Sequence, residues 1–232
     1  MLRILEPELM DTREDAEEYD AMDFTAPNTL FAEDALALVA RRPNPSVLDI
    51  GTGTAQIPIA MLERRRDLQI LAVDLAKEML KVAARKVADA GLSDRCQLAC
   101  IDAKALRVPA EKFDLVICNS TAHHIPDPLV LFKEIARVVK PDGAILVRDL
   151  IRPASMDEAW STVKRVAAGD GKRQQQLFFD SLCAALTLTE VEALVRSAQL
   201  DRVSVTQVSD RHWSAERKAS ADGPRRRTSS VQ

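Results

Sequence analysis

The chain has 232 residues, of which 47% are hydrophobic and 29% charged, and its formal net charge is −3. This length and composition are typical of one or two globular domains. The small net charge argues against electrostatic attraction to nucleic acid or to an anionic membrane surface. No apolar run approaches the roughly 20 residues of a membrane span, and the first residues do not resemble a secretory signal.

Residues 8–42 have the pattern of helices. The acidic segment around Tyr19 comes first, and an amphipathic helix then begins at Pro27 and extends through Arg41. A proline two residues later ends this helix, because the residue before a proline is disfavoured in the helical conformation.

The next segment predicts a strand, a glycine turn and a helix. Val47–Ile50 is an apolar run interrupted by Asp49, and Gly51 and Gly53 follow it directly. Glycines without a Cβ let a ligand approach the backbone, and the helix that follows points free N–H groups at that ligand. Two glycines alone are a weak signal, so the interpretation depends on the strands that come after them.

Three further apolar strands each end in polar residues. The strand at residues 70–73 ends at Asp74, the strand at 97–101 is followed by Asp102 and Ala103, and the strand at 113–118 ends at Asn119. In an open parallel sheet, ligands bind at the carboxyl ends of the strands. Asp74 follows the glycine turn at the spacing of an acidic residue that binds a ribose. We therefore expect these side chains to share one site.

The second half of the chain predicts a fifth strand, a group of helices and a final strand. Pro141-Asp142-Gly143 predicts a turn, with a positive φ at the glycine, before a strand at residues 144–147. Helices are expected over residues 155–198, with a break at 169–171, and a capping box formed by Thr189 and Glu192 begins the last one. Alternating valines predict a strand near residues 202–209.

A nicotinamide dinucleotide is one candidate ligand for the glycine turn. The fingerprint of such sites has a third small residue that allows close packing of helix and strand, but Gln56 stands there. Asp49 would also repel a pyrophosphate nearby, whereas it would attract an ammonium group. S-adenosylmethionine carries an ammonium group, a ribose diol and no phosphate, so it suits this turn better.

The region from about Val47 to Leu150 resembles class I S-adenosylmethionine-dependent methyltransferases, in particular bacterial small-molecule enzymes. The resemblance lies in VLDIGTGTA, LAVDLAKEML, CIDAKAL, FDLVICNSTAHHIPDP and VVKPDGAILVRDL, in this order. It implies an α/β fold with a Rossmann-like, doubly wound, seven-stranded sheet, mostly parallel, with an antiparallel C-terminal strand and a helical cap. The sheet of the resembled family typically closes with an antiparallel hairpin, whose second strand would be a short polar one near residues 211–217. The resemblance also implies the cofactor S-adenosyl-L-methionine, converted to S-adenosyl-L-homocysteine, and a cofactor site made of Asp49, Gly51, Thr52, Gly53, Asp74, Leu75, Met79, Asp102, Ala103 and Asn119.

On this basis we expect a single methyltransferase domain over residues 1–213. It would comprise an N-terminal helical lid (1–42), a cofactor-binding core (43–150), a helical cap (151–188), and a C-terminal helix and strand (189–213). The basic tail, residues 214–232, is rich in Ser, Pro and Gly and is expected to be disordered.

Three side chains are candidates for the chemistry. His123 and His124 follow the fourth strand, and a neutral imidazole suits proton removal near neutral pH. Adjacent residues point in different directions, so we favour His124 as the one that faces the site and His123 as a packing residue. Tyr19 is the third candidate, because N-terminal segments of the resembled family often cover the cofactor. The structural alternatives, a packing histidine and an aromatic anchor, stay open for all three.

The cysteine pattern and the strand ends narrow the ligands. The four cysteines form no Cys-x-x-Cys pair, which predicts free thiols in a reducing compartment; we expect a cytoplasmic protein and no metal site. The fourth strand does not continue into the Asn-Pro-Pro-aromatic stretch of enzymes that methylate amino groups of nucleic acid or protein. A small-molecule acceptor and no nucleic-acid partner are therefore expected. The acceptor atom and the oligomeric state stay open, with a homodimer as one option, and a non-catalytic S-adenosylmethionine-binding protein is the alternative function.

Overall fold

The computed structural model describes residues 1–6 and 11–220. Within these residues a seven-stranded sheet has the order β3-β2-β1-β4-β5-β7-β6, and β7 is antiparallel to both β5 and β6 whereas the other pairs are parallel. This confirms the predicted fold class. The strands are β1 (Ser46–Ile50), β2 (Gln69–Asp74), β3 (Cys96–Cys100), β4 (Phe113–Asn119), β5 (Val139–Leu150), β6 (Ser204–Gln207) and β7 (His212–Arg217).

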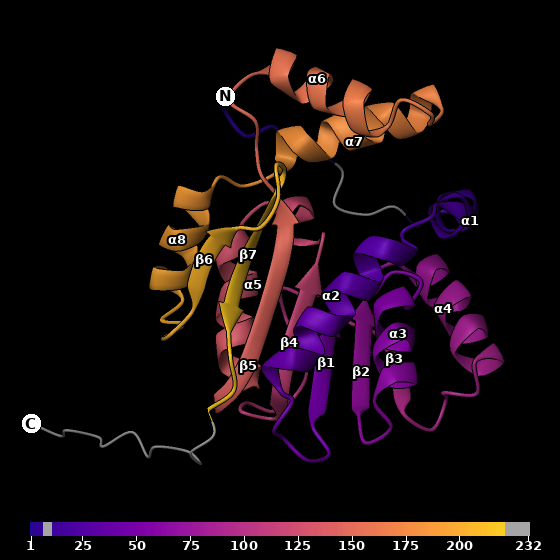
Figure 1. Cartoon of the computed structure of the whole chain (residues 1–232), viewed down its shortest axis with the longest axis vertical. Helices are drawn as coiled ribbons and strands as arrows, with labels where there is room; N and C mark the ends of the chain where they lie inside the picture. The colour runs from indigo at the N-terminus through magenta and orange to yellow at the C-terminus, as the bar shows by residue number, and fades with distance from the viewer. Residues whose placement is uncertain (7–10, 221–232) are drawn as a thin grey trace, which may run out of the picture.

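Helices cover both faces of the sheet and one of its ends. Buried side chains of α2, α3 and α4 form a core with one face, and those of α5 and α8 form a core with the other. The pair α6 and α7 lies beyond the end of the sheet, at the top of Figure 1, and α1 lies beside α4. The helices are α1 (Arg13–Ala21), α2 (Thr25–Leu38), α3 (Gln56–Arg64), α4 (Lys77–Asp89), α5 (Pro128–Val138), α6 (Met156–Val166), α7 (Lys172–Ala184) and α8 (Leu188–Ser197), with a short 3₁₀ helix η1 (Ala122–His124).

The central strands are buried on both faces, which explains their nearly continuous apolar sequences. In β1, Val47 packs in the core with α2 and α3, whereas Leu48 and Ile50 pack in the core with α5. Successive side chains of a strand point to opposite faces, so Asp49 lies on the same face as Val47. A carboxyl group at that position is exceptional and indicates a role other than packing.

Helix α1, in the segment expected to form a lid, is attached to the rest of the protein at two places. Arg173 of α7 forms ion pairs with Asp15 and Glu18 of α1, and Lys86 of α4 pairs with Asp20. The ring of Tyr19 packs against a small apolar cluster that includes α4. Residues of the lid, the cap and the core are therefore held together around one end of the sheet.

The expected turn at Pro141-Asp142-Gly143 is not a separate turn. These residues lie inside β5, where the pairing with β4 shifts its register, and Gly143 does not have the predicted positive φ. A Cβ on Gly143 would lie 2.9 Å from Cγ2 of Val139 and 3.1 Å from the carbonyl oxygen of Lys140. Glycine is needed here for space and not for its backbone freedom.

Two further expectations differ from the structure in position. The capping box of α8 is formed by Thr187 and Glu190 instead of Thr189 and Glu192: the Thr187 side chain accepts from the Glu190 N–H at 3.3 Å, and the Glu190 carboxylate accepts from the Thr187 N–H at 2.8 Å.

The C-terminal boundary also differs. The strand β7 continues to Arg217, so the first residues of the expected tail, which was placed at 214–232, belong to the sheet. The reason is that Trp213 is fully buried and the strand pairs with both β5 and β6. Residues 221–232 of the expected tail lie outside the described residues.

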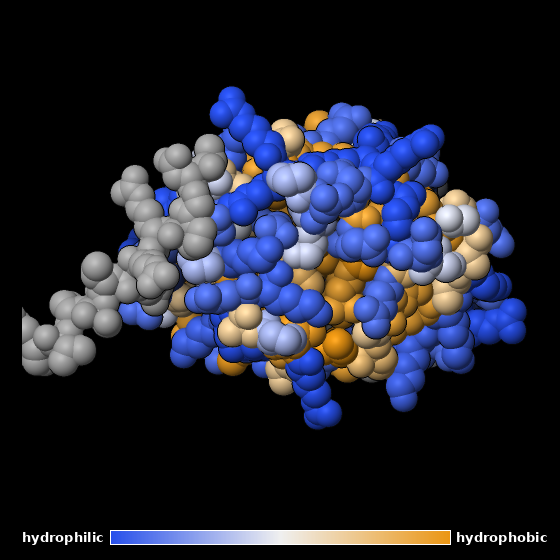
Figure 2. Space-filling view, turned by 90° about the horizontal axis from the view of Figure 1, so that it is seen from below, coloured by the Kyte–Doolittle hydropathy of each residue, from blue (hydrophilic) through white to orange (hydrophobic). Residues whose placement is uncertain are grey.

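The end of the molecule opposite the cap carries mainly hydrophilic residues, with hydrophobic ones visible between them (Figure 2). No helix in the described part of the chain is long and apolar enough to span a membrane.

Candidate functional site

A cavity lies at the carboxyl ends of the parallel strands. Each of its walls comes from the segment that follows one strand: the glycine turn after β1, the segment after β2, the tip of β3 and the loop after β4. The lid helix and α4 complete the lining. The lining residues are Tyr19, Gly51, Gly53, Asp74, Leu75, Ala76, Met79, Ile101, Asp102, Ala103, Ser120, Thr121, His124 and Ile125.

The glycine turn after β1 places backbone directly on the cavity. Gly51 has φ +73° and Gly53 has φ +54°, conformations that disfavour residues with a side chain. A Cβ on Gly51 would lie 2.1 Å from Oγ1 of Thr121, and a Cβ on Gly53 would lie 3.6 Å from the ring of Tyr19. The turn is therefore filled on one side by the β4 loop and faces the lid on the other.

Asp49 lies beneath this turn and is only 2% exposed. Its Oδ2 has no hydrogen-bond partner among the described residues, and the same is true of Oγ1 of Thr52. Burial is the main cause that raises the pKa of Asp49 to about 7; the Thr52 hydroxyl opposes this rise, and the neighbouring Asp74 carboxylate contributes to it. A buried carboxyl group without a partner is costly, so it indicates a group that becomes satisfied when the cavity is filled.

Asp74, at the end of β2, is already fixed by backbone donors. Its Oδ2 accepts from the Gly53 N–H at 2.7 Å, and its Oδ1 accepts from the Ala76 N–H at 2.9 Å. Burial raises the pKa of this carboxyl group, although those N–H groups counteract the effect. Because a carboxylate has about four acceptor positions, Asp74 can still accept two hydroxyl groups from a ligand.

The tip of β3 and the start of α4 form the more apolar part of the cavity. Leu75 and Met79 line it beside Ala103, and Asp102 is held in place by a hydrogen bond from the Lys104 N–H to its Oδ1 at 2.8 Å. An apolar slot with one carboxylate at its edge suits a flat, nitrogen-rich ring.

The lid contributes Tyr19 to the opposite wall. Its ring lies 5.3 Å from that of Phe24, centroid to centroid. Burial, with a smaller contribution from the carboxylates of Asp74 and Asp49, raises the pKa of the Tyr19 hydroxyl to about 12. The phenol therefore stays protonated near neutral pH and can donate a hydrogen bond to a ligand.

The two adjacent histidines have different surroundings. His124 lines the cavity, whereas His123 does not and is only 4% exposed. Nδ1 of His123 lies 2.6 Å from Oδ1 of Asp149, and its Nε2 lies 3.3 Å from Oε1 of Glu6. Burial lowers the pKa of His123, but the Asp149 and Glu6 carboxylates outweigh it and raise the pKa overall. His123 thus lies buried behind the cavity wall, between two carboxylates.

Of the predicted cofactor residues, seven line the cavity: Gly51, Gly53, Asp74, Leu75, Met79, Asp102 and Ala103. Three do not: Asp49 and Thr52 lie buried beneath the turn, and Asn119 pairs with Arg148 of β5 at the end of its strand.

The lining residues that sequence reasoning did not predict are Ala76, Ile101, Ser120, Thr121 and Ile125. Ser120 and Thr121 follow Asn119 directly, so their position after an apolar strand was a usable signal. Ser120 also has φ +53°, which turns the chain sharply toward the cavity.

The residues of this site lie in a region that is similar to known proteins. Residues 48–147 match the sequence profile of a family described as "Methyltransferase domain". The protein "Methyltransferase GfsG" of Streptomyces halstedii is 29% identical over 167 residues, which cover 71% of this chain and 55% of that protein. "Ubiquinone biosynthesis O-methyltransferase" of Idiomarina loihiensis is 38% identical over 106 residues, covering 46% of this chain and 42% of that protein. The chain thus spans about half the length of these curated relatives.

The solved structures agree on the fold. A SAM dependent methyltransferase from Aquifex aeolicus superposes with a TM-score of 0.64 at 18% identity, and the match covers 89% of this chain and 98% of that one. The matched profile begins in β1, ends in β5 and contains the glycine turn and the other strand ends that line the cavity. Residues 48–147 therefore match a methyltransferase domain, and the described chain has the fold of solved S-adenosylmethionine-dependent methyltransferases.

Proposed function

We propose that this protein transfers the methyl group of S-adenosylmethionine to an oxygen of a small-molecule acceptor. The observation that carries the proposal is that two groups of residues line the same cavity. The first group is Gly51, Gly53, Asp74 and Asp102 at the strand ends, and the second is Tyr19 and His124. The first four form a cofactor site at the strand ends, and the last two add polar side chains from the lid and the β4 loop. The O-methyltransferase name of a 38% identical relative supports oxygen as the acceptor atom.

The residues present suit the cofactor. The glycine turn gives a ligand access to the backbone, and Asp74 keeps acceptor capacity for both ribose hydroxyls. Leu75, Met79 and Ala103 would hold the adenine, with Asp102 near its amino group. Oδ2 of Asp49 has no partner among the described residues. Asp49 lies beneath the glycine turn, where the ammonium group of the cofactor would give it an electrostatic partner. Thr52 and Asn119 would complete the surroundings of the methionine end.

When bound, S-adenosylmethionine supplies a methyl group on a positively charged sulfur, and that sulfur, as the leaving group, keeps the electron pair of the broken S–C bond. The chain then has two tasks, alignment and proton removal. Tyr19 and the lid would close the cavity against water and orient the acceptor. A ring nitrogen of His124 would take the proton of the acceptor hydroxyl as the oxygen attacks the methyl carbon.

The first experiment is thermal melting of the full chain with S-adenosylhomocysteine and, separately, with NADH. A ligand at a hundred times its dissociation constant stabilises the folded state by about 2.7 kcal/mol, so S-adenosylhomocysteine should raise the melting temperature by several degrees and NADH should not. A response to NADH alone would reject the proposed cofactor.

The second experiment measures transfer of labelled methyl groups to a panel of small hydroxylated acceptors. We expect His124→Ala to lower turnover more than cofactor affinity, whereas His212→Ala, which removes the histidine at the start of β7, should change neither strongly. Cofactor binding without transfer to any acceptor, by the wild type, would favour a non-catalytic binding protein.

A further inference from the structure

Glu6 meets His123 and His124 beside the cofactor cavity, although it precedes the two adjacent histidines by more than a hundred positions in the sequence. Oε1 of Glu6 lies 3.3 Å from Nε2 of His123 and 3.0 Å from Nδ1 of His124. These three atoms all lie within 4.8 Å of one another. In a tetrahedral zinc site with bonds of about 2.0–2.1 Å, neighbouring ligand atoms are separated by about 3.3 Å. The cluster therefore has nearly the spacing of a ligand set.

The atoms that face one another in this cluster lack hydrogen-bond partners. Oε1 of Glu6 and Nδ1 of His124 are buried, and neither makes a hydrogen bond to any described residue, although they lie at ion-pair distance from each other. The Glu6 side chain is only 7% exposed. Its other oxygen, Oε2, accepts from the Ser181 hydroxyl at 3.1 Å, which fixes the carboxylate with Oε1 toward the histidines. Such orphaned buried atoms require a partner.

A second set of contacts orients the ligands. Nδ1 of His123 lies 2.6 Å from Oδ1 of Asp149, whose Oδ2 accepts from the His123 backbone N–H at 3.1 Å. Histidines that bind metals usually donate their other ring N–H to a carboxylate in this way, which fixes the tautomer and makes the free nitrogen a better ligand. With its Nδ1–H donated to Asp149, a neutral His123 would present Nε2, which faces Glu6, as a lone-pair donor to an ion.

The N-terminal segment that carries Glu6 is itself attached to the histidine loop. The guanidinium of Arg3 donates to the carbonyl oxygens of His123 at 2.9 Å, Ile125 at 3.0 Å and Pro126 at 3.1 Å. It also donates from Nε to the Ala184 carbonyl oxygen of α7 at 2.6 Å. The position of Glu6 over the histidines is therefore built by several contacts and does not depend on the carboxylate alone.

From these observations we propose that Glu6, His123 and His124 form a binding site for one divalent transition-metal ion such as Zn²⁺, beside the methyl-transfer cavity. Two imidazoles and a carboxylate suit Zn²⁺ and Fe²⁺, whereas Mg²⁺ and Ca²⁺ prefer sites made of oxygen atoms. Three protein ligands leave a coordination position for another molecule, as in catalytic zinc sites.

A bound ion would restrict which acceptors the enzyme can use. This inference about the acceptor rests on the proposed function. Because His124 lines the cavity, an ion on its Nδ1 adjoins the space in which an acceptor would lie. An acceptor hydroxyl bound to that ion would lose its proton more readily, since a metal ion lowers the pKa of a bound oxygen. The site thus favours acceptors with a hydroxyl that coordinates metal. Such a hydroxyl would release its proton to solvent on binding the ion, and His124 would then serve as a metal ligand instead of as the base.

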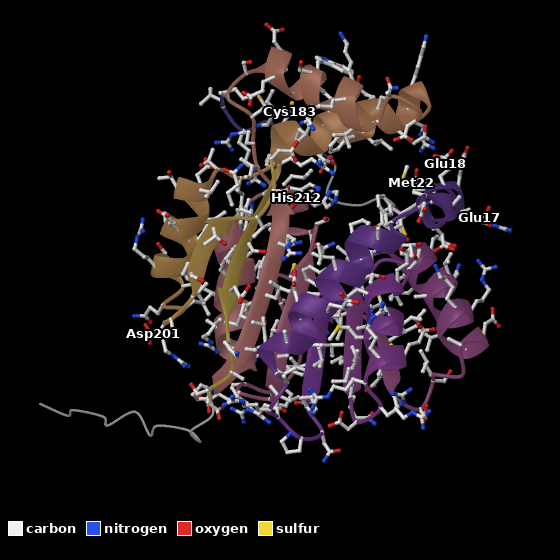
Figure 3. The ribbon with its side chains drawn as sticks, viewed as in Figure 1. Glu17, Glu18, Met22, Cys183, Asp201 and His212 are labelled. Atoms are coloured by element: carbon white, nitrogen blue, oxygen red, sulfur yellow. The ribbon has the colours of Figure 1, made fainter. Side chains whose placement is uncertain are left out.

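The test is a titration of the full chain with Zn²⁺ alone, followed by calorimetry, after chelator treatment and without S-adenosylmethionine. We expect one ion per chain. Glu6→Gln, which keeps the size of the side chain, and His124→Gln should each weaken binding at least a hundredfold, and Asp149→Asn should weaken it by about 10–100-fold. The control His212→Gln removes the remaining histidine of the chain, at the upper end of β7 in Figure 3, and should bind as the wild type does.

Two readouts keep the result unambiguous. Co²⁺ in place of Zn²⁺ should give the absorption of a nitrogen and oxygen site without a sulfur charge-transfer band, which separates this site from the four cysteines. A melting curve of each variant shows that it is folded. Absence of stoichiometric binding by the wild type, or equal binding by Glu6→Gln, would overturn the metal site and show an ion pair of Glu6 with the histidines only. Because no cofactor or acceptor is present, either result leaves the proposed methyl transfer to be decided by its own assay.

Discussion

The glycine turn after β1 allows a prediction with an internal control. Gly51 and Gly91 have similar positive φ angles, +73° and +67°, but a Cβ on Gly51 would lie 2.1 Å from Oγ1 of Thr121, whereas a Cβ on Gly91 would have no heavy atom within 4 Å. A side chain at such a φ costs about 1–2 kcal/mol, and this cost is common to both sites. Forcing an extra carbon into a filled space adds typically about 1–3 kcal/mol.

We therefore expect Gly91→Ala to lower the free energy of unfolding by about 1–2 kcal/mol and Gly51→Ala by about 2–5 kcal/mol. Urea denaturation followed by circular dichroism measures both. Gly51→Ala should also weaken S-adenosylhomocysteine binding at least tenfold, by calorimetry, because Thr121 must move within the cavity wall, and Gly91→Ala should leave it unchanged.

A further variant tests the cause. Thr121→Gly removes the atoms that the new Cβ would meet, so the double variant should lose less stability than the two single losses added together. Equal effects of Gly51→Ala and Gly91→Ala on stability and on binding would refute the reasoning, since the overlap with Thr121 would then be of no consequence.

Three other predictions follow from the site and from α8. Asp74→Ala should weaken S-adenosylhomocysteine binding at least tenfold in calorimetry, through the loss of about 1–3 kcal/mol of hydrogen bonding; unchanged affinity would contradict its placement at the ribose. Burial raises the pKa of Asp49 to about 7, above its value of about 4 in the unfolded chain, so folding favours the protonated form and this stabilisation is lost as the pH rises from about 4 to 7. Asp49→Asn, which cannot ionise, should lose less stability over that range in urea denaturation, and curves parallel to the wild type would contradict the burial effect. Thr187→Ala should destabilise the protein by about 1 kcal/mol in the same assay, and an equal loss in Thr189→Ala would contradict the observed cap.

The cofactor half of the site could be predicted because its signals are local. A buried parallel strand shows as an apolar run, and the residue that ends it must lie at the carboxyl edge of the sheet. Gly51, Asp74 and Asp102 were found in this way, and the cavity brings all three together. Because neighbouring parallel strands are in register, residues that end different strands lie next to one another in the same wall of the cavity.

The capping of α8 shows where a local pattern has two solutions. Both Thr187 and Thr189 are followed three residues later by a glutamate. The earlier pair forms the cap, and its Glu190 also binds Arg152 at 2.6 Å. Arg152 follows β5 and is distant in sequence. This contact across the fold favours Thr187 and Glu190 as the capping pair, and the sequence of the segment alone does not indicate which pair forms the cap.

The domain boundary was expected within β7, at residue 213, because the polar residues of this strand are satisfied by distant partners. Ser214 accepts from Nε of Arg148 at 2.9 Å, and Nε of Arg217 donates to the Gly143 carbonyl oxygen at 2.8 Å. These contacts make a polar segment suitable for burial, and they exist only once β5 and β7 are paired. The position of Glu6 was missed for the same reason, since only the contacts of Arg3 and Ser181 place it beside the histidines.

Tyr19 is the only tyrosine of the chain, and it lines the cavity above the glycine turn. Fluorotyrosine incorporated biosynthetically would therefore give a single fluorine resonance, without any engineered substitution. That resonance would report directly on the lid wall of the cavity. Its chemical shift and line width would show when a ligand enters, whether the ring exchanges between positions on the millisecond timescale, and whether an acceptor alters the lid after the cofactor has bound.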